Sequence, residues 1–135
     1  MTRSRSAGGL MKKKVVWIKV KPRSFVPPAN SFGDLVFTSG DGPDDLEGDI
    51  KKQTEETLRN IDVALRAGGA SLRSVLKITV YLSDMKNYSS MNEVYKGFFP
   101  HDPPARTCVE VRSPMFSKGQ LIEMEVVAVK SVSKG

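Results

Sequence analysis

The chain has 135 residues, a length that predicts one domain with a proper hydrophobic core. No run approaches the roughly 18 apolar residues of a membrane span, and the start of the chain lacks the continuous apolar segment of a secretory signal. One cysteine excludes an internal disulfide, and one cysteine with one histidine argues against zinc, whereas a carboxylate-held magnesium site stays open.

The net charge of +6 is concentrated near the N-terminus. Residues 1–23 carry eight basic and no acidic side chains, whereas the rest of the chain carries 13 basic and 15 acidic ones. A nucleic-acid-binding domain more often has its basic patch on the fold itself. We therefore expect neither nucleic acid nor a membrane as the partner.

Residues 1–14 (MTRSRSAGGLMKKK) show no apolar periodicity. We predict that they form a disordered basic leader or an expression remnant, and that the domain spans residues 15–131. An Arg/Ser-rich start without acidic residues also resembles an organelle transit peptide, but this one is short for that role. The expected location is the cytoplasm, and the single cysteine fits a reducing compartment.

The first half of the domain begins with strand patterns and continues with a helix pattern. Residues 15–20 (VVWIKV) predict a strand because they are rich in β-branched side chains, and the prolines that follow predict an irregular connection. A second strand is expected at residues 35–39. After the turn GDGPDD, apolar residues recur at three- and four-residue spacing, which predicts an amphipathic helix that ends at Gly68-Gly69.

In the second half of the domain, strand and helix patterns alternate. Residues 75–82 predict a strand, a helix is expected over about residues 88–99 before a proline, and strands are expected at residues 103–111 and 121–129. The order β-β-α-β-α-β-β places the chain in the α+β class. We expect two helices on one face of a mixed sheet of about six strands, counting an additional turn or strand near the N-terminus. The uncovered face then predicts self-association.

The last two strands hold the candidate chemistry. Alternation places Arg106, Cys108 and Glu110 on one face of the PPARTCVEV strand, and Glu123 and Glu125 on one face of the LIEMEVVAV strand. If the two strands pair, as sequential strands often do, the arginine and two glutamates occupy one sheet face. Arginine binds carboxylates through a planar fork, and a nearby glutamate can orient or deprotonate a water.

A structural interpretation explains the same pattern. Arg and Glu on facing strands often form a solvated cross-strand pair, and a lone cysteine is usually a small buried hydrophobe. His101, beside a proline-rich turn, is expected to be a loop residue and not a catalytic base. The pattern alone favours this structural interpretation over a binding site.

The segments LVFTSG, VLKITVYLSDMKNYSSMNEVYKGFF, PPARTCVEV and IEMEVVAV together resemble the RidA family over about residues 32–130. This family is also called YjgF, and an older description of its members is L-PSP endoribonucleases or translation inhibitors. The resemblance implies a chorismate-mutase-like α+β fold assembled as a homotrimer, with the sheets forming an inner barrel. It also implies three sites in clefts between subunits.

The resemblance further implies an activity: hydrolysis of reactive imines and enamines such as 2-aminoacrylate to 2-keto acids and ammonia. This is the chemistry of a 2-iminobutanoate/2-iminopropanoate deaminase, and it requires no metal or organic cofactor. By this resemblance Arg106 binds the substrate carboxylate and Glu123 positions the attacking water. Cys108 lines the pocket without a nucleophilic role, and Ser39 and Asn92 match substrate-binding residues.

The chain departs from the family pattern at three places, one of which is a slightly longer loop between the last two strands. The GPYSQ-like segment, whose tyrosine reaches into the site, is replaced by RSFVPPANSFG, in which Val26 falls near the tyrosine and Phe25 cannot donate a hydrogen bond. The frequent SGQ is SGD, with Asp41 after the glycine. The alternative is therefore a non-catalytic trimer that senses 2-keto or amino acids, and an endoribonuclease is less favoured. Retention of both Arg106 and Glu123 favours catalysis.

Overall fold

The structure is a computed structural model that describes residues 12–112 and 117–131. Most of the predicted leader, residues 1–11, lies outside the described part of the chain. Strand β1 (Lys13–Val16) begins two residues before the expected domain boundary. It ends four residues before the predicted end of the first strand, because the chain turns after Trp17.

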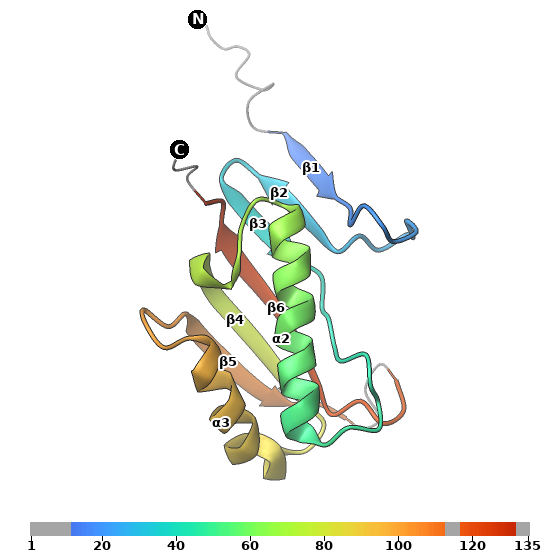
Figure 1. Ribbon diagram of the computed structural model, residues 1–135, viewed down its shortest axis with the longest axis vertical. Coiled ribbons are helices and arrows are strands. Elements are labelled where there is room, and N and C mark those ends of the chain that lie inside the picture. The colour runs from blue at the N-terminus through green and yellow to red at the C-terminus, as the bar shows by residue number, and fades with distance from the viewer. Residues whose placement is uncertain (1–11, 113–116, 132–135) are drawn as a thin grey trace, which may run out of the picture.

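Six strands form a single mixed sheet in the order β1-β2-β3-β6-β4-β5 (Figure 1). Only β4 and β5 are parallel, and every other neighbouring pair is antiparallel. After β1, the elements are β2 (Ala29–Phe32), β3 (Leu35–Thr38), α2 (Ile50–Ala67), η1 (Leu72–Ser74), β4 (Val75–Leu82), η2 (Met85–Asn87), α3 (Tyr88–Phe98), β5 (Ala105–Glu110) and β6 (Ile122–Val129). The α+β class and the mixed six-stranded sheet are therefore confirmed.

Helix α2 begins and ends at the residues that local chemistry favours. Asp49 caps it, since its Oδ1 accepts a hydrogen bond from the Lys52 amide at 2.9 Å. Gly68 follows the last turn, and a Cβ at that position would approach the Val36 side chain to 3.1 Å. The missing side chain thus lets the helix end pack closely on the sheet.

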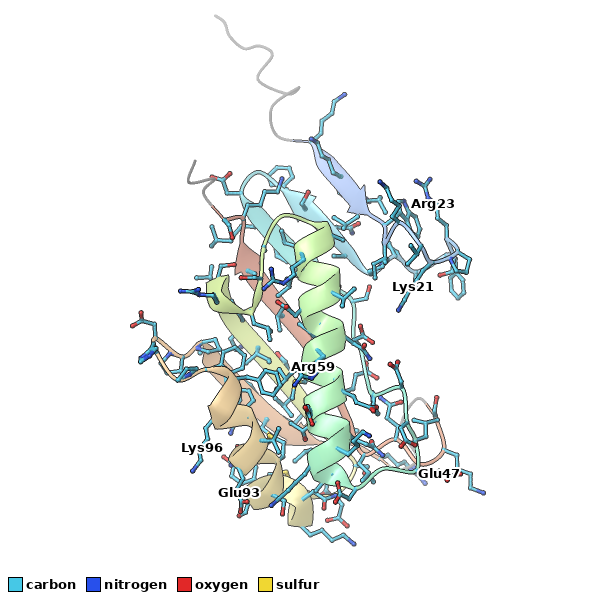
Figure 2. The ribbon with its side chains drawn as sticks, in the orientation of Figure 1. Lys21, Arg23, Glu47, Arg59, Glu93 and Lys96 are labelled. Atoms are coloured by element: carbon cyan, nitrogen blue, oxygen red, sulfur yellow. The ribbon has the colours of Figure 1, made fainter. Side chains whose placement is uncertain are left out.

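Both helices cover the same face of the sheet (Figure 1). On that face Ile78, Val80 and Leu82 of β4 pair with Val126, Met124 and Ile122 of β6, and all six side chains are buried. Helix α2 contributes Leu58, Ile61 and Leu65 to this core, and α3 contributes Met91 and Tyr95. Figure 2 shows Arg59 on α2 and Glu93 and Lys96 on α3, all exposed on the outer surface of the helices.

The opposite face of the sheet has no cover from the described residues. Apolar side chains are exposed there, among them Phe37 at 41% and Val109 at 40%, close to charged and hydroxyl-bearing neighbours. By strand register the face includes Val15, Asn30, Phe32, Phe37, Lys77, Thr79, Tyr81, Thr107, Val109, Glu123, Glu125 and Val127. We call these residues the open face.

Strand β2 forms the C-terminal part of the segment that was expected to be an irregular connection, so the prediction was wrong for residues 29–32. The prolines stop just before Ala29, and the two-residue Gly33-Asp34 turn, with Gly33 at φ 58°, joins β2 to β3 as a hairpin. A Gly-Asp pair between short runs is a hairpin signal. The additional N-terminal strand needed for six strands is this one.

The predicted pairing of the last two strands is also wrong. Strand β4 lies between β5 and β6 and pairs with both. The physical reason is the helix α3 between β4 and β5, which makes a crossover that returns β5 parallel to β4. The chain then enters β6 on the other edge of β4.

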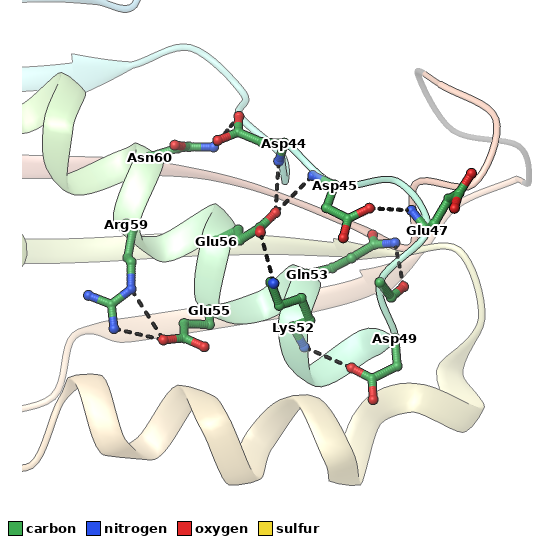
Figure 3. Close-up of polar contacts among 11 residues, drawn as sticks. Asp44, Asp45, Glu47, Asp49, Lys52, Gln53, Glu55, Glu56, Arg59 and Asn60 are labelled. Carbon is green, nitrogen blue, oxygen red and sulfur yellow. Dashed lines mark hydrogen bonds and ion pairs between the residues drawn. The ribbon is translucent and has the colours of Figure 1, made fainter.

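The segment between β3 and α2 is fixed by side chains of α2 (Figure 3). Glu56 Oε1 accepts the amides of Asp44 and Asp45 at 3.0 and 2.8 Å. The buried Gln53 amide donates to the Gly48 and Gly119 carbonyls, each at 3.0 Å, and its oxygen accepts the Leu121 amide at 2.8 Å. Helix α2 thus holds the loop that follows β3 and the loop that precedes β6.

Candidate functional site

Arg106 lies near the start of the edge strand β5 and points towards α3. It stands in register with the buried Ile78 of β4, so its side chain is on the helix-covered face. Its Nη1 donates to Asn92 Oδ1 at 2.7 Å, and its Nη2 donates to the Tyr88 hydroxyl at 3.2 Å. A weak contact from Nη1 to Met91 Sδ is 3.9 Å long.

The partners of this guanidinium are neutral. Its Cζ lies 4.6 Å from the ring centre of Tyr95 and 5.6 Å from that of Tyr88, distances typical of cation–π contacts. No carboxylate in the described part of the chain forms an ion pair with Arg106. A half-buried cation without a counter-ion has charge available for an anion, and a carboxylate fits the planar guanidinium.

Cys108 follows Arg106 on the same face of β5, in register with Val80. Burial raises the pKa of its thiol, and the nearby Arg106 opposes that shift only in part. The side chain packs against the hydrophobic core. A thiol with a raised pKa is mainly protonated at neutral pH, which suits a packing role better than a nucleophilic one.

Glu123 lies on β6 opposite Tyr81 of β4, and it belongs to the open face. Its Oε1 accepts a hydrogen bond from Gln120 Nε2 at 3.3 Å. A Cβ on Gly40 would collide with the Glu123 carboxylate. The glycine of the TSG segment therefore leaves the space that the carboxylate occupies.

Ser39 stands directly before Gly40 and anchors the β1–β2 connection. Its hydroxyl donates to the Pro27 carbonyl at 2.6 Å, and its amide donates to the Pro28 carbonyl at 2.9 Å. The anchored loop carries Phe25 and Val26, which are 98% and 51% exposed. In the protomer Ser39 thus holds the loop that replaces the family's tyrosine segment beside Gly40.

Asp41 follows on the other side of Gly40. Its backbone pairs with Met124 through two hydrogen bonds of 2.9 Å, and its Oδ1 accepts the Gly42 amide at 3.0 Å. Burial raises the pKa of the Asp41 carboxyl to about 6, although the Gly42 amide and Lys21 act in the opposite direction.

The predicted site residues form two groups in the protomer. Arg106, Cys108 and Asn92 meet on the helix-covered side at β5 and α3, whereas Ser39 and Glu123 lie around Gly40. Arg106 and Glu123 project from opposite faces of the sheet, so the expectation that they share one face was wrong. The reason is that β4 separates β5 from β6. Arg106 stands beside Ile78 of β4 and Glu123 beside Tyr81, and Ile78 and Tyr81, three residues apart on one strand, point to opposite faces.

Two residues of the arginine environment escaped the sequence analysis. Tyr88 and Tyr95 contact Arg106 from the same side as Asn92. The spacing of Tyr88, Asn92 and Tyr95 is four and then three residues, which puts all three on one stripe of a helix. This periodicity could have pointed to the two tyrosines once Asn92 was identified as a candidate binding residue.

A separate hollow of about 320 Å³ lies where η1 meets the end of α3. None of the predicted site residues lines it, and His101 stands there as an exposed loop residue, as expected. Its lining consists of Leu72, Arg73, Phe98, Phe99, Pro100, His101 and Asp102. Residues 12–112 and 117–131 contain no cluster of three or more His, Cys, Asp or Glu side chains suited to a metal ion.

No helix in the described part of the chain is both long enough and apolar enough to cross a membrane.

Known sequences and solved structures are similar to this chain. A profile of the family described as Endoribonuclease L-PSP matches residues 20–130. A RutC family protein of Pyrococcus abyssi is 41% identical over 129 residues, which are 89% of this chain and 99% of the relative. TdcF of Escherichia coli, described as a candidate reactive intermediate deaminase, is 32% identical over 130 residues, covering 88% of this chain and 98% of TdcF.

Solved structures agree with these matches. Yeast Mmf1 superposes with a TM-score of 0.81 and 31% identity, covering 89% of this chain and 100% of Mmf1. The crystal structure of E. coli TdcF with bound serine gives a TM-score of 0.74 and 31% identity, covering 87% of this chain and 99% of TdcF. The profile match, the relatives and the shared fold together show that the chain belongs to the endoribonuclease L-PSP family, which is the RidA/YjgF family that its motifs resemble.

Proposed function

We propose that this protein is a cofactor-independent deaminase that hydrolyses 2-aminoacrylate-type enamines and imines to 2-keto acids and ammonia. The observation that carries the proposal is Arg106, a half-buried guanidinium held by neutral groups and without a carboxylate partner among the described residues. The kinship with TdcF, a candidate reactive intermediate deaminase, supports this class of reaction.

The proposed site is shared between subunits of a homotrimer. Arg106 and Glu123 stand on opposite faces of the sheet in one protomer, so they reach one small substrate only if two copies contribute them. The open face, with Phe37 and Val109 about 40% exposed, supplies apolar surface that such an assembly would bury. Each cleft would then contain Arg106 of one subunit and the partner subunit's Glu123.

The reaction needs a held carboxylate and a directed water. Arg106 binds the substrate carboxylate, and Asn92 keeps the guanidinium in place through the 2.7 Å hydrogen bond. An enamine first tautomerises to its imine by moving a proton to carbon. Glu123 orients a water whose oxygen bonds to the imine carbon, and the carbinolamine collapses as the C–N bond breaks, giving the ketone and ammonia.

The remaining predicted residues shape the pocket. Ser39 fixes the Phe25–Val26 loop beside Gly40, and Gly40 leaves room for the Glu123 carboxylate. Cys108 lines the floor next to Arg106 with a protonated thiol. We expect this activity in the cytoplasm, where pyridoxal-phosphate enzymes release such intermediates.

The test is a coupled deaminase assay. An amino-acid oxidase or a serine/threonine dehydratase generates the imine, and semicarbazide traps what the protein does not hydrolyse. We expect the wild type to divert imine to keto acid, and both Arg106→Ala and Glu123→Ala to lose at least about a hundredfold in kcat/KM, because each removes a group needed in the transition state. Arg73→Ala, a change of an exposed arginine away from both residues, is the matched control.

A folded wild type that leaves every imine unhydrolysed would contradict the deaminase proposal. The second candidate, a regulatory trimer that binds 2-keto or amino acids without turnover, would then take its place if the protein still binds the keto acid. The loop carrying Phe25 and Val26 favours this candidate, because neither side chain offers a hydrogen bond to a reacting group. Sequence-independent cleavage of RNA would instead support the endoribonuclease alternative.

A further inference from the structure

Tyr88 presents its hydroxyl at the edge of the Arg106 guanidinium. We propose that this hydroxyl is a second binding group for the substrate carboxylate, donating a hydrogen bond to the oxygen atoms that Arg106 also binds. The inference rests on the proposed function, since it concerns the same carboxylate. It adds a specificity residue from α3 that the sequence analysis did not identify.

The hydrogen-bond inventory of Arg106 shows where a carboxylate can approach. Both Nη1 hydrogens point at α3, one at Asn92 Oδ1 and the other at Met91 Sδ. Nη2 gives one hydrogen to Tyr88. The Nε hydrogen and the other Nη2 hydrogen have no partner in the described part of the chain. A carboxylate that pairs with this free edge comes next to the Tyr88 oxygen.

The Tyr88 hydroxyl is set up to donate at that place. It accepts the hydrogen bond from Nη2 at 3.2 Å, so its own proton must point elsewhere. The described residues include no acceptor for that proton. The side chain is 38% exposed, so the hydroxyl is open to a ligand as well as to water.

The other tyrosine at Arg106 is arranged differently. Tyr95 lies beneath the guanidinium, is 8% exposed, and has a buried hydroxyl with no hydrogen-bond partner in the described structure. Its ring supports the cation, and burial raises the pKa of its hydroxyl. Of the two phenols, only Tyr88 combines contact with Arg106, exposure and a proton available for donation.

The experiment compares Tyr88→Phe with the wild type and with Ser89→Ala, which removes an exposed hydroxyl from the neighbouring position of α3. Calorimetry measures the dissociation constant of 2-oxobutanoate, and the coupled assay measures kcat and KM. We expect Tyr88→Phe to weaken binding of 2-oxobutanoate roughly tenfold, the usual loss of one hydrogen bond to a charged group. We expect KM to rise with little change in kcat, because the carboxylate is bound equally in the ground and transition states. The melting temperature and the Ser89→Ala values should match the wild type.

The outcomes separate this inference from the proposed function. If the wild type is active and Tyr88→Phe binds 2-oxobutanoate as tightly as the wild type, the deaminase stands and the role of Tyr88 is wrong. If the keto acid binds in a Tyr88-dependent manner without turnover, the inference stands and the deaminase fails. If the wild type neither hydrolyses imines nor binds 2-oxobutanoate, both are wrong. A tenfold loss of kcat at unchanged binding would also contradict a carboxylate-binding role.

Discussion

Asp41 is a carboxyl group whose surroundings disfavour its charge. Its pKa rises from 3.8 to about 6, chiefly through burial, with smaller contributions from Asp44 and Glu123. The folded state therefore holds the proton more tightly than the unfolded state. Stability falls as pH rises through the window from about 4 to about 6, and it stays lowered above that window.

Replacement of Asp41 by Asn tests this assignment. The amide oxygen can still accept the Gly42 hydrogen bond, whereas the buried charge is gone. We expect a gain in stability at pH 8 of at most about 3 kcal/mol, less what solvent screening removes, from a shift of about two pKa units. The gain should vanish near pH 4. Denaturant unfolding at both pH values measures it, with the exposed Asp34→Asn as control, and a gain independent of pH would contradict the assignment.

Individual residues could be identified from sequence to differing extents. Arg106, Asn92 and Cys108 were named from motifs, and the structure places them together. Tyr88 was not identified, because no local pattern shows which distant side chain a helix residue contacts, and only the 3.2 Å contact shows its hydroxyl at the arginine.

At the level of elements, α2 acts as the fixed support of the Glu123 region. Gln53 is fully buried and joins three backbone groups, two of which, at Gly119 and Leu121, lie in the segment that leads into β6. Its removal leaves these partly buried groups without their protein partner, at a cost of about 1–3 kcal/mol for each group that water cannot reach.

We therefore expect Gln53→Ala to destabilise the fold by about 3–5 kcal/mol. The matched change on the same helix is Glu55→Ala, which breaks an exposed ion pair with Arg59 at 2.7 Å. That change should cost at most about 0.5 kcal/mol, since surface pairs at this spacing contribute little. Urea unfolding of both variants measures the difference. Equal losses would show that Gln53 has no special role in positioning the loops.

Helix positions were predictable, whereas strand neighbours were not. The apolar periodicity predicted α2 and the glycines after Ala67 predicted where it ends, because these signals are local. Strand pairing depends on contacts between distant segments. The interpretation that sequential strands pair failed for β5 and β6, since the α3 crossover puts β5 on the outer side of β4.

At the scale of the whole molecule, a single copy of the chain does not bring the proposed catalytic residues together. Arg106 and Glu123, the two residues proposed to act on the substrate, lie on opposite faces of the sheet. The open face also exposes apolar side chains that a monomer would leave in water. The proposed trimer with shared sites would account for both features.

Subunit complementation tests that claim most directly. Arg106→Ala and Glu123→Ala proteins, each inactive alone, are unfolded, mixed in equal amounts and refolded together. With shared sites, about three-quarters of random trimers are hybrids that regain one complete cleft in three, so the mixture should recover about a quarter of wild-type activity. Refolded single variants and refolded wild type are the controls. If the mixture stays as inactive as the single variants while wild type recovers, Arg106 and Glu123 do not act across a subunit boundary, and the shared-site account is wrong.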